Sequence, residues 1–200
     1  MPRQYSMEKR RQATGEIRSR ILEATLDEVA AANGQEVTLQ AVAARADLAL
    51  RTLYNHFAGR DQLLAAAFRH HAEQTRAAVD AVTVPDADPE QQLRHVVEAY
   101  HQRYAQMGPR LSALLALRGL PELDDQIHRI RVQRAQRLGH VIDRAQRAGI
   151  LEVPPSTAIA LAYALTSHAG WQSLCEQVDD SPTEATRVAN EALRSALFHR

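Results

Sequence analysis

Residues 38–57, TLQAVAARADLALRTLYNHF, decide the fold, because they encode two short helices joined by a turn that is too tight to bury anything else. Thr38 is a good N-cap for the first helix, whose Val42 lies on an apolar face at helical spacing. On the second helix Leu53 and Phe57 are four residues apart and face inward. This pattern predicts a helix-turn-helix.

The polar and aromatic side chains of the second helix project outward, where they suit contacts to a DNA groove. Arg51 is the expected base reader, because an arginine can bind a guanine edge with two hydrogen bonds. Thr52 and Tyr54 are expected at bases or adjacent phosphates. The full set of predicted DNA-binding residues is Thr38, Arg51, Thr52, Tyr54, Asn55, His56 and Arg60.

The T-L-Y-x-H-F run that ends at Phe57, the Thr38 start and the alanine-rich first helix closely resemble the DNA-binding domain of the tetracycline-repressor (TetR) family of transcriptional regulators. The resemblance covers about residues 14–75. Two positions depart from the family pattern, since Asp47 replaces the usual turn glycine and Ala49 replaces a serine N-cap. Aspartate tolerates a left-handed turn, whereas alanine removes a capping oxygen. The alternative is two ordinary helices in an all-α bundle.

Composition bounds the class of protein. A chain of 200 residues with 45% hydrophobic content can form one or two compact domains without disulfides. There is no apolar run of about 18 residues and no signal-peptide pattern, so we expect a soluble cytoplasmic protein with no membrane partner. The single cysteine, Cys175, is expected to be a buried structural thiol. The net charge is zero, yet residues 1–20 carry six basic and two acidic side chains, typical of either a DNA-binding arm or a solvated tail.

Almost every segment has helical periodicity, so the sequence predicts an all-α protein with an N-terminal helix-turn-helix domain and a C-terminal helical domain. The predicted domains are 14–75 and 83–200, separated by the linker 83–88. The helices expected outside the helix-turn-helix span about 14–32, 60–82, 89–107, 110–117, 121–146 and 156–176, and the final helix runs from about 182 to 197.

The last two predicted helices favour self-association. The segment 156–176 is apolar on most of its circumference, so something besides its own domain should cover it. The final helix carries a stripe of small residues that allows close helix approach, and its alternative role is packing within the chain. The resemblance to the TetR family implies that these helices pair with their copies in a four-helix interface. The predicted interface residues are Leu165, Ala185, Val188, Ala189, Ala192, Leu193 and Ala196.

The C-terminal domain also contains apolar helices with a few amphipathic side chains, a mixture that suits a small-molecule pocket as well as an ordinary core. The predicted effector-pocket residues are Tyr100, Tyr104, Met107, Tyr163, His168, Trp171 and Gln172. No catalytic motif is present. The pairs His70-His71 and His168 with Cys175 lack zinc-site spacing, so neither a metal nor a cofactor is predicted.

We therefore expect a homodimeric TetR-like regulator that binds a palindromic double-stranded DNA operator and acts as a repressor relieved by a small, partly apolar effector. The helix at 60–82 is expected to couple the effector site to the DNA-binding domain. The competing class is a helical-bundle enzyme or metal-binding protein without DNA affinity.

Overall fold

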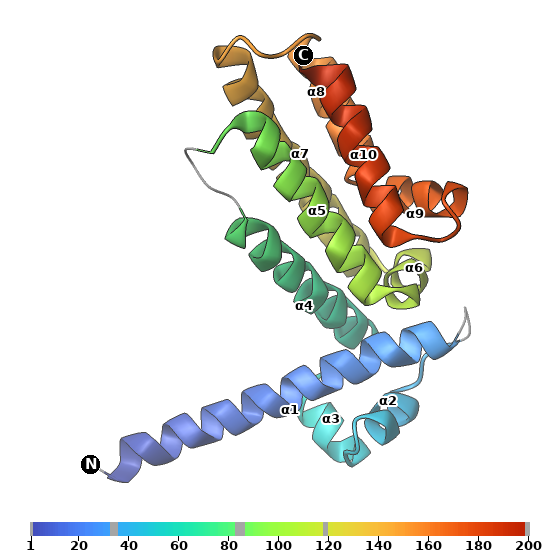
Figure 1. The fold of residues 1–200 in the computed structure, drawn as a ribbon. Helices are drawn as coiled ribbons and strands as arrows, with labels where there is room; N and C mark the ends of the chain where they lie inside the picture. The colour runs from blue at the N-terminus through green and yellow to red at the C-terminus, as the bar shows by residue number, and fades with distance from the viewer. Residues whose placement is uncertain (1, 33–35, 83–86, 118–119, 199–200) are drawn as a thin grey trace. The chain divides into compact units, whose positions relative to one another are not determined.

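The computed structural model describes residues 2–32, 36–82, 87–117 and 120–198, with side chains from residue 12 onward. Within these ranges the chain forms ten α-helices and no strand beyond an isolated bridge between Leu151 and Phe198 (Figure 1). The all-α prediction is confirmed. The helices are α1 Pro2–Ala32, α2 Leu39–Arg45, α3 Leu50–His56, α4 Arg60–Ala81, α5 Pro89–Met107, α6 Pro109–Ala116, α7 Pro121–Arg147, α8 Pro155–Leu165, α9 His168–Gln177 and α10 Pro182–Leu197.

The chain divides into two compact units. Unit 1 comprises Met1–His71 and Pro109–Ile127, and unit 2 comprises Ala72–Gly108 and His128–Arg200. The helix-turn-helix lies in unit 1. Helices α4 and α7 each contribute residues to both units.

Helix α6 belongs to unit 1, although the sequence places it in the C-terminal domain. The reason is local packing and charge. The guanidinium of Arg110, at the start of α6, lies 3.4 Å from a carboxylate oxygen of Glu23 in α1 and also pairs with Asp27. Because these contacts join residues more than 80 positions apart, no local pattern predicts them.

The core of unit 1 follows the predicted apolar faces. Ile21 and Leu26 of α1, Leu53 of α3 and Leu63 of α4 are essentially inaccessible to solvent. Helix α1 begins at Pro2 rather than near residue 14, since the charged segment before Thr14 contains good helix formers and proline suits a first helical position. The linker prediction at 83–88 lies largely outside the described residues.

The boundaries of α5 in unit 2 match the sequence signals. The Asp88 carboxylate accepts a hydrogen bond from the Gln91 N–H at 3.0 Å and caps the helix. Gly108 ends the helix with a positive φ of 51°. Leu138 and Ile142 lie on the buried side of α7.

The predicted single helix over 156–176 is wrong, because the chain breaks into α8 and α9 at Thr166. The Thr166 hydroxyl donates to the Ala162 carbonyl at 2.7 Å, and the Ser167 hydroxyl caps α9 by accepting from the Gly170 N–H at 2.9 Å. A Cβ atom on Gly170 would lie far inside van der Waals contact of the Ala164 carbonyl oxygen. Serine capping and glycine at this close approach produce the break.

Among the described helices, none combines the length and the apolar character needed to span a membrane. Cys175 is buried in α9, and burial raises the pKa of its thiol. Cys175 is therefore a packed side chain in the interior of unit 2.

Candidate functional sites

The turn between α2 and α3 has the geometry of a helix-turn-helix. Thr38 accepts a hydrogen bond from the Ala41 N–H at 3.2 Å and caps α2. Asp47 in the turn adopts a left-handed φ of 51°, and its carbonyl oxygen accepts a hydrogen bond from Arg20 at 3.0 Å. Ala49 makes no side-chain cap for α3, as its residue type implies.

Helix α3 has one buried face and one exposed polar face. Leu53 and Phe57 are 0% and 2% exposed, whereas Tyr54 is 52% exposed. Arg51 and Asn55 are also exposed, and Thr52 and His56 are half-buried. The sequence therefore predicted the outward face of α3 with the correct register. A helix that presents an exposed polar face and is held by a buried apolar face is able to enter a DNA groove.

Arg60 has contacts within unit 1 that the sequence did not predict. Its Nε donates to the Val37 carbonyl oxygen at 3.1 Å, and its Nη1 lies 3.1 Å from the Asp61 carboxylate. The bond to Val37 fastens the start of α4 to the segment that precedes α2. Arg60 thus supports the fold in addition to its place among the predicted DNA-binding residues.

Arg18 is a second cation that sequence reasoning did not place in this region. Its guanidinium lies 4.5 Å from the centroid of the Phe57 ring, a cation–π contact that braces the end of α3 against α1. The backbone of the basic arm is part of α1, while the side chains of Arg3, Lys9 and Arg10 lie outside those described.

Unit 2 brings most of the predicted effector-pocket residues into one aromatic cluster. The ring of Tyr104 lies 6.2 Å from Tyr100, 5.4 Å from His168 and 5.8 Å from Trp171, measured between ring centroids. Tyr100, Tyr104 and Trp171 are buried, and His168 is half-buried. Helix α5 supplies the tyrosines, and α9 supplies the other two rings.

The remaining predicted pocket residues behave differently from one another. Met107 is buried at the end of α5, and Gln172 is exposed on α9. The exposure of Gln172 separates it from the buried rings, because Trp171 next to it occupies the inward position. Tyr163 of α8 joins the cluster, because its ring faces the guanidinium of Arg134.

Arg134 of α7 lies at the centre of the cluster and was missed by sequence reasoning. Its Nη1 donates to the Tyr104 hydroxyl and to the Thr166 carbonyl, each at 3.2 Å. Its guanidinium carbon lies 4.3 Å above the Tyr163 ring. The signal was present, because Arg134 precedes the buried Leu138 by one helical turn and so interrupts the apolar stripe of α7 with a charge.

Burial sets the protonation of the groups around Arg134. Desolvation raises the pKa of Tyr104 to about 12 and also raises the pKa of Tyr100, so both phenols are neutral near pH 7. Desolvation lowers the pKa of His168, which favours a neutral imidazole. The rings around the guanidinium therefore offer hydrogen-bonding groups and no negative charge.

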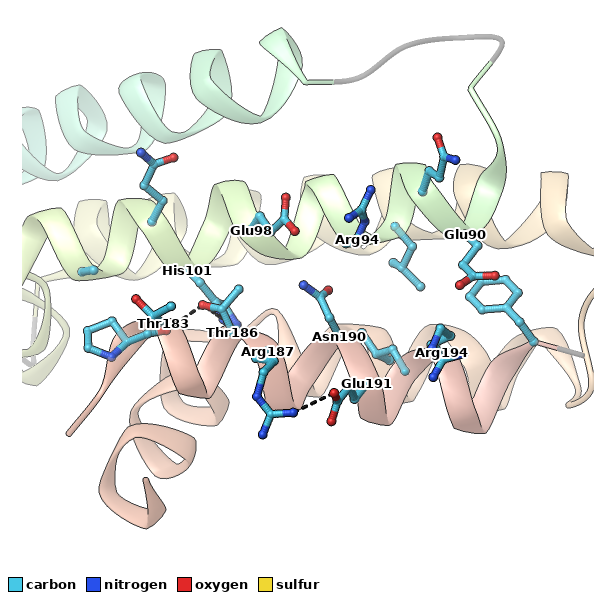
Figure 2. Close-up of a pocket in the computed structure, with 17 residues that line it drawn as sticks. Glu90, Arg94, Glu98, His101, Thr183, Thr186, Arg187, Asn190, Glu191 and Arg194 are labelled. Atoms are coloured by element: carbon cyan, nitrogen blue, oxygen red, sulfur yellow. Dashed lines mark hydrogen bonds and ion pairs between the residues drawn. The ribbon is translucent and has the colours of Figure 1, made fainter. Parts of the chain in front are cut away.

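A separate groove of about 810 Å³ lies between α5 and α10 in unit 2 (Figure 2). Charged side chains line much of the groove, and the imidazole ring of His101 is also among the lining groups. Arg187 pairs with Glu191 at 2.6 Å on the α10 side. None of the predicted effector-pocket residues lines this groove. The labelled lining residues are Glu90, Arg94, Glu98, His101, Thr183, Thr186, Arg187, Asn190, Glu191 and Arg194.

The predicted self-association surface needs a correction. Ala185, Ala189 and Leu193 are 0%, 0% and 2% exposed, because this ridge of α10 packs against other helices of its own unit. They cannot form an outer surface.

The remaining predicted interface residues of α10 do reach the surface. Ala192 and Ala196 are exposed, and Val188 is half-buried. Leu165 at the end of α8 is half-buried as well. Leu161 of α8, which the sequence reasoning did not include, is 38% exposed although it is a large apolar residue.

The tight turn at Asp47 between α2 and α3, together with the exposed polar face of α3, places the chain in the helix-turn-helix class of proteins. Residues 21–67 match the family model described as bacterial regulatory proteins, tetR family. The match covers the helix-turn-helix and parts of its two flanking helices, so this part of the chain is similar to regulators of the TetR family.

Relatives and solved structures agree with this similarity. A stretch of 86 residues is 36% identical to the HTH-type transcriptional repressor KstR of Mycolicibacterium smegmatis and covers 43% of the chain and 42% of KstR, less than half of either protein. A TetR transcription regulator from Haloarcula marismortui has the same fold, with a TM-score of 0.75 at 19% identity over 92% of this chain and 100% of that chain. A structure described as the SmeT–triclosan complex has a TM-score of 0.72 at 16% identity, covering 92% of each chain.

Proposed function

We propose that the protein is a transcriptional repressor that binds a palindromic operator as a homodimer and leaves it when a small molecule binds unit 2. The observation that carries the proposal is the exposed polar face of α3 above the buried Leu53 and Phe57, within a TetR-type helix-turn-helix. The similar protein KstR is named a transcriptional repressor, which supports the sign of regulation.

The homodimer rests on the outer face of α8 and α10. Only Ala158 and Ala162 of α8 are buried, although the helix is almost wholly apolar. Its exposed Leu161 and the exposed Ala192 of α10 lie on helices that contact each other within unit 2. Small side chains permit close helix approach, and a second copy presents the same face around a twofold axis.

The effector is assigned to the aromatic cluster around Tyr104 rather than to the groove between α5 and α10. The groove carries exposed charges that already pair with one another, such as Arg187 with Glu191. The cluster combines apolar rings with buried polar atoms, which is the usual composition of a small-molecule site. The SmeT–triclosan complex, a structure with a similar fold, supports a small-molecule effector.

The test of DNA binding uses fluorescence anisotropy with duplexes from the intergenic DNA upstream of the protein's own gene. We expect salt-dependent binding, and we expect Arg51→Ala to lose about 1–3 kcal/mol of binding free energy and to relax the preference at one base position. Arg69→Ala is the matched control, because Arg69 is an exposed arginine of unit 1 on α4. Equal losses for the two variants would contradict the role of Arg51.

Ligand relief makes a second, independent demand. If effector and operator oppose each other, each must weaken the other's binding by the same factor, roughly 5- to 150-fold for a coupling of about 1–3 kcal/mol. Small molecules are first screened for a rise in the melting temperature of the protein. A molecule that raises it is then titrated by calorimetry into free protein and into protein saturated with operator. Identical affinities in both titrations would mean that this molecule does not release the protein from its operator, and ligand relief would be contradicted. Absence of binding to any upstream duplex would favour the helical bundle without DNA affinity.

A further inference from the structure

Arg134 carries a buried charge that forms no ion pair within the described residues. The residue is 8% exposed, and the groups that act on its guanidinium are tyrosines and no carboxylate. Its hydrogen-bond acceptors are the Tyr104 hydroxyl and the Thr166 carbonyl oxygen, both uncharged. A buried cation without an anion is unfavourable, so a protein keeps one only where something else compensates it.

Several unused polar atoms lie beside this charge. Arg134 Nε, Trp171 Nε1 and His168 Nε2 are buried and make no hydrogen bond within the described residues. The first two are N–H donors, and Trp171 is 9% exposed. The ring centroids of His168 and Trp171 lie 5.8 Å apart, and both lie within 6 Å of Tyr104, so these groups belong to one aromatic cluster.

The position of α9 adds to the same preference for negative charge. His168 is the first residue of α9 and Trp171 lies in its first turn, so the N-terminus of this ten-residue helix is next to the cluster. A helix N-terminus favours an anion. The unsatisfied donors and the unpaired guanidinium are the independent observations that point to a ligand.

We propose that the effector is an organic carboxylate with an apolar body, whose carboxylate binds Arg134 and the Trp171 N–H while its body packs against the rings of Tyr100 and Tyr104. The inference rests on the proposed function, which places the effector in unit 2. One guanidinium compensates one carboxylate, and the flanking tyrosines are neutral. A phosphate dianion would leave a second charge unpaired in this apolar surrounding.

The charge of Arg134 is dispensable for folding on this view. The Thr166 carbonyl still accepts from the Tyr104 hydroxyl at 2.8 Å when the guanidinium is absent. Methionine has a similar length and an apolar side chain, so Arg134→Met removes the unpaired charge and leaves no acceptor without a donor. The apo variant should melt at the temperature of the wild-type protein or above it.

The binding test compares carboxylates with neutral amides of the same shape: phenylacetate with phenylacetamide, octanoate with octanamide, and 2-naphthoate with 2-naphthamide. Calorimetry gives the affinities of the full chain. Trp171 is the sole tryptophan, so its fluorescence reports occupancy of this site directly. Arg131→Met is the matched control, because Arg131 is an exposed arginine on the same helix.

We expect at least one carboxylate to bind about 10- to 100-fold tighter than its amide, to change Trp171 emission, and to lose this preference in Arg134→Met but not in Arg131→Met. Equal affinity for acid and amide, no binding by any of the three acids, or a preference that survives in Arg134→Met would overturn the proposal. So would a melting temperature of apo Arg134→Met well below that of Arg131→Met, since Arg134 would then be structural.

The operator assay separates this result from the proposed function. If the chain binds upstream DNA but shows no preference for carboxylates, the carboxylate proposal fails and the repressor stands. If carboxylates bind through Arg134 but no upstream duplex is bound, the anion site stands and the repressor fails.

Discussion

At the scale of single residues, His101 shows how burial determines protonation in unit 2. It is 1% exposed, and its Nε2 lies 2.8 Å from the Leu165 carbonyl oxygen. A carbonyl only accepts, so Nε2 carries the proton. Nδ1 faces the Thr186 hydroxyl at 3.1 Å. Desolvation lowers the pKa of His101, although the bond to Leu165 opposes the shift.

This lowered pKa predicts a loss of stability in acid. The unfolded chain binds a proton near the ordinary histidine pKa of 6.5, whereas the folded chain resists it, so the stabilising contribution is complete above pH 6.5 and is lost as the pH falls below it. Each such histidine contributes at most about 1.4 kcal/mol per pH unit.

Urea unfolding between pH 7.5 and 5 measures the effect. His101→Gln should flatten the decline of unfolding free energy with falling pH, and adding His168→Gln should flatten it further, because burial lowers that pKa as well. An unchanged slope in the double variant would contradict the assignment.

For two glycines of unit 2, we expect replacement by alanine to have opposite effects on the stability of the protein. Gly170→Ala should destabilise the protein by about 1–3 kcal/mol, because the new methyl group overlaps the Ala164 carbonyl in a packed helix break. Gly139→Ala should stabilise by roughly 0.5–1 kcal/mol, since its methyl would meet only Ile159 at an ordinary 4.0 Å within helix α7. Thermal unfolding of the pair distinguishes them, and a similar effect of both would show that the break tolerates a side chain.

At the scale of elements, the two helices of the motif differ in how they begin. Thr38 caps α2 with its hydroxyl, whereas α3 begins at Ala49 with an extended backbone and no side-chain cap. The backbone N–H groups of the first α3 turn therefore lack the partner that a serine would supply.

Capping predicts a reciprocal pair of effects. Thr38→Ala should cost about 0.5–2 kcal/mol of unfolding free energy, and Ala49→Ser should recover about 1 kcal/mol where the wild-type chain has no cap. Both residues lie near the predicted DNA face, so stability is measured by urea unfolding without DNA. A destabilising Ala49→Ser would mean that the start of α3 cannot accept a hydroxyl.

Elements also show where local signals succeed. The predicted cap at Thr38 forms in the structure, and Asp88 and Ser181 cap their helices as their residue types favour. The boundary at Thr166 was not predicted, because the apolar composition of 156–176 favours one continuous helix. The close approach that requires Gly170 appears only when α8 and α9 are packed.

At the scale of the whole molecule, the proposed dimer determines whether two helix-turn-helix motifs reach one operator. Recognition helices in such dimers contact half-sites about 34–36 Å apart. The exposed apolar residues of α8 and α10 on one chain are therefore expected to be covered by the same residues of a second chain.

Ala192→Arg places a charge on this exposed face without altering the buried ridge of α10. We expect a monomer by light scattering and a loss of operator binding, because each chain would hold only one half-site. Ala77→Arg, an exposed alanine of α4 in unit 2, is the control and should leave the dimer intact. A fully dimeric Ala192→Arg protein would contradict the interface.

The sequence by itself determined the all-α class, the helix-turn-helix and the register that exposes Arg51 and Tyr54 while it buries Leu53 and Phe57. These features depend on neighbours within one or two helical turns, and such neighbours are visible in the sequence. Only the tertiary structure decided which stripe of α10 is interior, because both stripes of that helix contain small apolar residues. It also placed Arg134 among rings from α5, α8 and α9, a meeting of distant segments that no local periodicity records.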